Sequence, residues 1–360
     1  MKQTKQSGAI RGFLARKNIV ISAKRYGIDA LGAMAQGLFA SLLIGTIVAT
    51  LGTQLDISFL ITVGNYTKAT PTVGAAMAVA IGYALQAPPL VLFSLVSVGA
   101  AANELGGAGG PLSVLFISII AAECGKALSK ETKIDILVTP LATILPGIFF
   151  ALTCAPVIGT AASGIGQIIM WATEQQPFLM GIIVSVVMGM ALTLPISSAA
   201  ICHALGLVGL AGGAAVAGCC AQMVGFAVMS FQENKWSGLI SQGLGTSMLQ
   251  MGNIVKNPRI WIPPTLAAAI TGPIATCLFG FTMNGAAISS GMGTCGLVGQ
   301  IGVYTGWLNE IAAGTKTAIT GMDWLAMILI CFVLPAILSV AFCQILRKIG
   351  WIREGDLKLD

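Results

Sequence analysis

Charged residues are scarce in this sequence. They make up only 9% of the 360 residues, while 56% are hydrophobic, and a soluble domain usually has about 25% charged residues. A soluble globular protein is therefore excluded. Aromatic residues are also few, at 7%, whereas glycine is abundant, with 45 residues. Because small residues let helices approach closely in lipid, this composition predicts an all-α integral membrane protein.

The signatures of common enzymes are also missing. The sequence has no Walker A loop, so we do not expect ATP-driven transport by this chain alone. It has one histidine, His203, and no Ser-His-Asp set outside the membrane, so we do not expect hydrolysis. The cysteines include no C-x-x-C pair, and Cys219-Cys220 has no histidine nearby. We therefore expect no metal site and no cofactor, in a protein that is not an enzyme.

The net charge of +6 comes mainly from the two ends of the chain. Seven of the 19 basic residues precede Asp29, and four lie at or after Arg347. Basic flanks are typical of cytoplasmic ends, so these charges indicate a membrane and not a nucleic acid as partner. We predict a basic cytoplasmic segment at residues 1–29, a transmembrane transport domain at 30–346 and a cytoplasmic tail at 347–360. Apolar residues interleave with the basic ones in Arg11–Arg25, so an amphipathic segment on the membrane surface is one option.

Many apolar stretches approach the roughly 20 residues that a helix needs to cross a bilayer. They are Ala30–Leu51, Pro111–Cys124, Ile134–Ile158, Phe178–Ser198, Pro263–Phe281 and Trp324–Ile345. Three further stretches are broken. Residues 73–103 contain Gln86-Ala87-Pro88-Pro89, residues 199–231 contain Gly212-Gly213 and Gly218, and residues 284–304 contain six glycines.

The distribution of lysine and arginine favours one topology for the broken stretches. Suppose that residues 73–103 and 199–231 each go in and come back, as two spans or as a re-entrant hairpin. With a cytoplasmic N-terminus, only Lys68 and Lys316 then lie outside, whereas single crossings would move the basic group at Lys126–Lys133 outside as well. The first arrangement predicts about ten membrane segments with both ends in the cytoplasm, provided that residues 284–304 also dip in and return.

Broken helices in a membrane have two interpretations. Non-helical backbone at membrane depth lines cavities and marks transport sites, but glycine also serves close helix packing. Two of the breaks carry a similar pattern: Ile196-Ser197-Ser198 precedes Gly206-Leu-Val-Gly209, and Ile288-Ser289-Ser290 precedes Gly296-Leu-Val-Gly299. The repeat suggests that two similar hairpins flank one site.

Polar residues in or near the broken stretches are candidates for binding a solute. His203 could bind a hydroxyl or a proton, or bond a neighbouring carbonyl for packing. Asn103-Glu104 begins the glycine-rich stretch Asn103–Pro111, which we expect to be a loop, either held close to substrate or exposed and flexible. Amide and hydroxyl groups suit a neutral sugar or polyol. The candidate substrate-binding residues are His203, Ser197, Ser198, Asn284, Ser289, Glu104, Asn103, Gln86 and Gln222.

Three segments have a distinctive sequence: Asn103-Glu-Leu-Gly-Gly-Ala-Gly-Gly-Pro-Leu112, Glu131-Thr-Lys-Ile-Asp-Ile-Leu-Val-Thr-Pro-Leu141 and Lys256-Asn-Pro-Arg-Ile-Trp-Ile-Pro-Pro264. They resemble enzyme IIC, the membrane subunit of the bacterial phosphotransferase system, in its perfringolysin O regulator-like branch, and the resemblance covers about Ala30 to Leu346. The resemblance implies a homodimer of about ten helices per protomer, with re-entrant hairpins and an elevator-like movement. It also implies that a partner domain phosphorylates the incoming sugar.

The sequence departs from that family's pattern in one hairpin. Sugar-transporting relatives carry a glutamate before the Asn-Pro segment, but the comparable stretch Leu194–Ile201 has no carboxylate, and no IIA or IIB domain is fused to the chain. We expect a multi-pass transporter of a small neutral polyhydroxy solute in the bacterial cytoplasmic membrane, with any phosphotransfer supplied by separate IIA and IIB proteins. A membrane sensor derived from a transporter and a secondary transporter of a small anion are the alternatives.

Overall fold

The structure, a computed structural model, describes residues 12–359, and their regular structure is helical. The one β-type pairing in this range is an isolated bridge between Gly209 and Met283. The predicted all-α fold with broken helices is therefore confirmed. The chain divides into two compact units. Unit 1 comprises Met1–Leu42 and Thr67–Gly159, and unit 2 comprises Leu43–Tyr66 and Thr160–Asp360.

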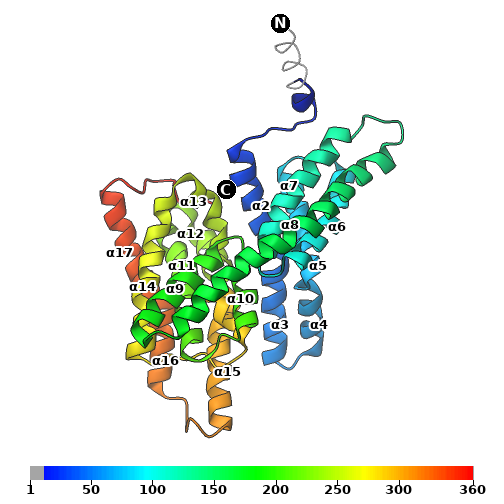
Figure 1. The fold of residues 1–360 in the computed structure, drawn as a ribbon. Coiled ribbons are helices and arrows are strands. Elements are labelled where there is room, and N and C mark those ends of the chain that lie inside the picture. Colours follow the sequence, from blue (N-terminus) through cyan, green and yellow to red (C-terminus); the bar gives the residue numbers. More distant parts are fainter. Residues whose placement is uncertain (1–11, 360) are drawn as a thin grey trace. The chain divides into compact units, whose positions relative to one another are not determined.

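Unit 1 is a bundle in which α5 packs on both α2 and α6, and α6 packs on α7 (Figure 1). Its elements are η1 (Arg25–Asp29), α2 (Ala30–Leu38), η2 (Phe39–Leu43), α5 (Thr70–Ala84), α6 (Pro89–Gly106), η3 (Gly107–Gly109), α7 (Gly110–Leu128) and the first part of α8 (Asp135–Thr173). The break predicted between α5 and α6 is confirmed. Gln86 has a positive φ of 55°, and α6 starts at Pro89, where the missing N–H of proline costs no helical hydrogen bond.

The glycine-rich stretch Asn103–Pro111 is not the loop that the sequence predicts. Helix α6 continues to Gly106, a single tight turn follows, and α7 begins at Gly110. Gly107 has a φ of +49°, which a residue with a side chain adopts only with strain. A side chain at Gly109 would collide with the backbone carbonyl of Ile158. These glycines therefore make a sharp turn and close packing between helices.

Unit 2 contains the remaining helices. They are α3 (Ile44–Gln54), α4 (Ser58–Thr67), the end of α8, α9 (Pro177–Thr193), α10 (Ser198–Leu205), α11 (Gly209–Met229), α12 (Phe231–Ile240), η4 (Ser241–Gly245), η5 (Ser247–Gln250), α13 (Met251–Lys256), η6 (Pro258–Trp261), α14 (Ile262–Pro273), η7 (Ile274–Leu278), η8 (Ala287–Gly291), η9 (Cys295–Leu297), α15 (Val298–Ala312), α16 (Gly321–Ile328), η10 (Leu329–Val333) and α17 (Leu334–Lys348). Helix α11 lies at the centre of this unit, in contact with α9, α14 and α17 (Figure 1).

The glycines of α11 do not break the helix, so the break predicted at Gly212-Gly213 and Gly218 was misplaced. Helix α11 runs without interruption from Gly209 to Met229. A side chain at Gly213 would collide with the carbonyl oxygen of Phe281, and one at Gly218 with that of Ser185. These glycines serve close packing around a central helix. The chain breaks instead at residues 206–208, between α10 and α11.

Six helical stretches in the described part of the chain are long and apolar enough to cross a membrane. They are Arg25–Gln54, Pro89–Leu128, Asp135–Thr173, Gly209–Met229, Pro258–Leu278 and Gly321–Lys348, with α5 and α9 as shorter apolar helices. The apolar window of Gly209–Met229 is 94% buried, whereas that of Asp135–Thr173 is 22% buried. The first is a core helix, and the second offers its apolar side chains to the surroundings, as expected of an integral membrane protein.

Candidate functional site

Two broken segments of unit 2 lie against each other. In the first, α10 ends at Leu205, Gly206 follows in the left-handed region, and extended backbone at Val208 leads into α11. The second includes Met283, and Gly209 and Met283 exchange two backbone hydrogen bonds of 2.9 Å each. Gly209 has a φ of +67°, so glycine is the residue that suits this crossing. The pairing provides partners for backbone that has left the helix, as backbone at membrane depth requires.

Two serines reinforce this pairing by reciprocal hydrogen bonds. The hydroxyl of Ser198 donates to the carbonyl of Gly291 at 2.7 Å, and the hydroxyl of Ser290 donates to the carbonyl of Leu207 at 2.6 Å. Both serines are buried. They occupy the same position in the two Ile-Ser-Ser patterns, so the segments with the repeated sequence do lie together. Each segment thereby bonds the backbone of the other.

Asn284 links this pairing to a carboxylate. The N–H of Gly209 donates to Asn284 Oδ1 at 3.0 Å, which orients the amide so that Nδ2 donates to Glu310 Oε1 at 2.5 Å. Thr282 donates to the same oxygen at 3.3 Å. Glu310 lies in α15 and is half-buried. The broken segments therefore hold a positioned carboxylate.

Three of the candidate residues on these segments keep unused hydrogen-bonding capacity. Ser197 caps α10 by accepting the N–H of Ala200 at 3.2 Å, so its hydroxyl hydrogen remains available. Within the described part of the chain, no hydrogen bond of the His203 or Ser289 side chain was found, and the His203 side chain is exposed. These side chains and the Glu310 carboxylate include both donors and acceptors of hydrogen bonds.

Gln222 is fully buried and lies in a different hydrogen-bond network of unit 2. Its Oε1 accepts from Trp261 Nε1 at 3.0 Å and from Thr193 at 3.3 Å, and its Nε2 donates to Thr265 at 3.1 Å. Thr193 also shares a hydrogen bond with Ser247 at 2.8 Å. This amide links α11 to α9, η6 and α14 at a position where unpaired polar atoms are costly.

The other three candidates lie in unit 1. Buried Asn103 donates to the carbonyl of Thr70 at 2.8 Å and so ties the end of α6 to the start of α5. Glu104 follows it on α6 and is exposed. Gln86 is also exposed, and its Oε1 accepts from Asn18 Nδ2 at 2.5 Å. Two of these three side chains therefore have protein partners.

Sequence reasoning missed Glu310. The stretch comparable to the family hairpin, Leu194–Ile201, has no carboxylate, whereas Glu310 lies more than 100 residues further along the chain. The sequence does contain a feature that could have pointed to Glu310, because Asn309-Glu310 is its second Asn-Glu pair and follows the third broken stretch. No group of three or more histidine, cysteine, aspartate and glutamate side chains suited to a metal ion was found among the described residues.

Comparison with known proteins found a family match whose residue range includes the candidate site. The family model described as "Phosphotransferase system, EIIC" matches residues 28–359. No match to the chain was found among curated proteins or among solved structures. The matched range includes both broken segments of unit 2 and Glu310.

Proposed function

Because this chain belongs to the EIIC family of the phosphotransferase system, whose members are the membrane permease subunits for sugars, we propose that its solute is a neutral polyhydroxy molecule bound at the paired segments of unit 2. The observation that carries this proposal is Glu310, a half-buried carboxylate oriented by Asn284 beside two broken segments. A carboxylate accepts hydrogen bonds from hydroxyl groups, and the nearby amide and hydroxyl groups provide both donors and acceptors.

The charge at this site favours a neutral solute over an anion. Among the described residues, no lysine or arginine forms an ion pair with Glu310. Lys316, which follows α15 in the chain, pairs with Asp323 instead. An anionic solute here would lie beside an uncompensated carboxylate, and that repulsion is strong where water is scarce. A hydroxyl group meets no such penalty. The secondary transport of an anion is therefore the weaker hypothesis.

We assign distinct roles to the candidate residues. Glu310 accepts hydrogen bonds from solute hydroxyls, while His203, Ser197 and Ser289 contribute the remaining polar contacts. Ser198 and Asn284 hold the two segments in register. Gln222 stabilises the helix packing of unit 2 without contacting the solute. For Asn103, Glu104 and Gln86, a role in solute binding stays a prediction.

The phosphotransfer partners, the oligomeric state and the membrane orientation belong to the same proposal and are inferred mainly from the family. Separate IIA and IIB proteins would supply phosphotransfer, because this chain has no enzyme motif of its own. The protein would act as a homodimer, with both ends in the cytoplasm on the strength of its basic flanks.

A binding screen tests the solute class. The full chain, purified in detergent, would be heated with neutral sugars and polyols, with their phosphates and with small carboxylates. A ligand that binds only the folded state raises the melting temperature, by an amount that grows with concentration above Kd. We expect a neutral sugar or polyol to do so. A shift with anions alone would support the anion transporter instead, and binding of a neutral solute without uptake by vesicles would support the sensor.

A further inference from the structure

A cluster of basic residues in unit 1 holds residues 16–18 against the ends of two helices. Lys17 Nζ donates to the carbonyl of Ser129 and pairs with Glu131, both at 2.5 Å, and Arg16 pairs with the same carboxylate at 3.2 Å. These interactions join two segments more than 100 residues apart. Positively charged side chains are thus gathered just beyond α7, at the boundary between apolar helix and polar loop.

Lys126 adds a buried cation beneath this cluster. Its side chain is 1% exposed, and its ammonium group bonds the carbonyls of Asn18 and Leu85, at 2.8 and 3.0 Å, and Glu123 at 3.0 Å. Arg25 donates to the same Leu85 carbonyl at 2.5 Å. Two cations therefore meet at the C-terminal end of α5, where the helix dipole is negative.

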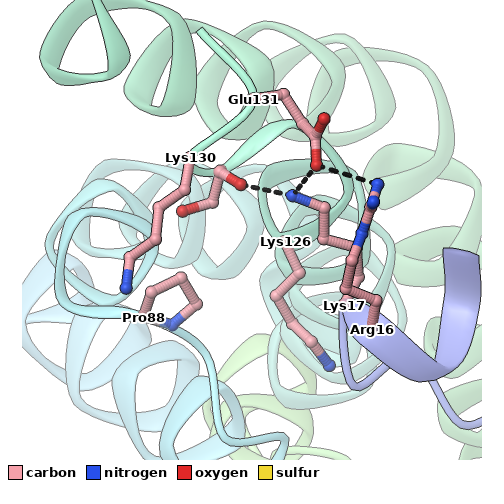
Figure 2. Close-up of a pocket in the computed structure, with 7 residues that line it drawn as sticks. Arg16, Lys17, Pro88, Lys126, Lys130 and Glu131 are labelled. Carbon is pink, nitrogen blue, oxygen red and sulfur yellow. Dashed lines mark hydrogen bonds and ion pairs between the residues drawn. The ribbon is translucent and has the colours of Figure 1, made fainter. Parts of the chain in front are cut away.

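A cavity of about 490 Å³ lies within this cluster. Its lining consists of Arg16, Lys17, Pro88, Lys126, Ser129, Lys130 and Glu131. In Figure 2, Lys130 stands beside Pro88 on one side of the cavity, and Arg16 and Lys17 stand on the other. The cavity is large enough for a phosphate group and its ester substituent.

The lining carries a surplus of positive charge. Four of the seven residues are cationic, and Glu131 is the one carboxylate among them. The hydrogen bond from Lys17, with the charges of Lys17 and Arg16, lowers the pKa of Glu131, so this carboxylate is ionised and engaged by those two cations. In the described part of the chain, no ion pair was found for the Lys130 side chain. Its backbone is fixed, with a φ of 59° and an N–H that donates to Asp135 at 2.6 Å.

We propose that this cavity binds the phosphate group of an anionic membrane lipid. Basic pockets at the ends of membrane helices recognise lipid headgroups, and phosphate accepts hydrogen bonds from both lysine and arginine. A lipid is favoured over free phosphate because exposed apolar side chains adjoin the lining residues along the chain, namely Val20, Ile21, Leu128 and Ile134. These side chains are suited to contact acyl chains while the headgroup fills the cavity.

The site is distinct from the solute site proposed in unit 2, so each proposal can fail alone. Lipid binding has a structural consequence of its own. A phosphate held by Lys130 and Arg16 would fasten residues 16–18 to the loop after α7, in addition to the ion pairs already present. Bound lipid should therefore stabilise unit 1 whether or not a solute is bound.

The test compares lipids and charge-matched variants of the full chain in detergent. Native mass spectrometry would measure the binding of phosphatidylglycerol, of phosphatidylcholine and of inorganic phosphate. The pocket variant is Arg16→Ala with Lys130→Ala. The control is Lys24→Ala with Lys133→Ala, which removes two exposed charges that do not line the cavity. Both variants change the net charge equally.

We expect the protein to prefer phosphatidylglycerol over phosphatidylcholine by at least tenfold. The pocket variant should bind it roughly 25-fold more weakly, from about fivefold per basic group near the membrane surface, and the control should stay within about twofold of wild type. Equal losses in the two variants, or no preference between the lipids, would overturn the proposal. Binding of inorganic phosphate without a preference for phosphatidylglycerol would overturn the lipid as the source of the phosphate.

Discussion

The reciprocal serine bonds predict a coupled loss of stability. Ser198→Ala removes the donor to the carbonyl of Gly291, and Ser290→Ala removes the donor to the carbonyl of Leu207. Both hydroxyls are buried, so water does not readily replace them. Alanine keeps the helical and turn conformations accessible, so the effect reports on the hydrogen bonds and not on the backbone.

The expected size follows from the cost of leaving a buried carbonyl without its donor. Each single substitution should lower the free energy of unfolding by about 1–3 kcal/mol. The two bonds join the same pair of segments, so loss of one loosens the other. The double variant should therefore depart from the sum of the single effects by at least about 0.5 kcal/mol.

The assay is equilibrium unfolding in mixed micelles, with solute binding measured on the same samples. Ser237→Ala is the matched control, because Ser237 is exposed in α12 of the same unit. We expect weaker solute binding in both single variants, since the segments that carry the site would lose their register. Additive stability losses together with unchanged solute affinity would refute the coupling of these segments to the site.

Two further substitutions separate structural contacts from the site. Gln222→Leu leaves the indole N–H of Trp261 without its acceptor, so it should lower the free energy of unfolding by about 1–3 kcal/mol. The solute Kd of the folded protein should be unchanged. A solute Kd that rises about tenfold, or 1.4 kcal/mol, would place Gln222 in contact with the solute. Leu357→Ala removes a fully buried side chain from the C-terminal segment, whose carbonyl also accepts from Asn234 and Gln250, at 2.8 and 2.9 Å. The Leu357→Ala variant should lose about 2–5 kcal/mol of unfolding free energy and be cleaved faster by trypsin after Arg353. Gln232→Ala, at an exposed position of the same unit, should be cleaved at the wild-type rate. Equal cleavage rates in the two variants would show that Leu357 does not hold this segment.

The fold class and one of the breaks between helices were predictable from the local chemistry of the sequence. Low charge content and repeated apolar stretches suffice for an all-helical membrane protein. The break after α5 was predictable because Pro88 and Pro89 cannot continue a helix from the residues before them. The break in residues 199–231 was misplaced, because the chemistry of glycine does not say whether it ends a helix or lets another backbone approach. Gly213 and Gly218 do the second.

The composition of the candidate site was only partly predictable. The repeated Ile-Ser-Ser pattern indicated that two segments belong together, and the bonds of Ser198 and Ser290 bear this out. Glu310 could not be placed from its own neighbourhood, because its contact with Asn284 depends on how α15 folds back on the segment before it. The sequence also does not indicate that the ammonium group of Lys126 is buried against the carbonyls of Asn18 and Leu85.

The most direct test of the central claim is uptake of a neutral solute by vesicles that contain the Glu310→Gln variant. Glutamine keeps an oxygen that can accept from Asn284, so the fold should persist, but a charge-assisted hydrogen bond to the solute is lost. That loss is worth about 1.5–3 kcal/mol, so the affinity for the neutral solute found in the screen should fall roughly 10- to 150-fold. Glu174→Gln, at an exposed position of the same unit, should behave as wild type. Uptake with unchanged affinity in the Glu310→Gln variant would contradict the account, because the solute would then bind somewhere other than beside this carboxylate.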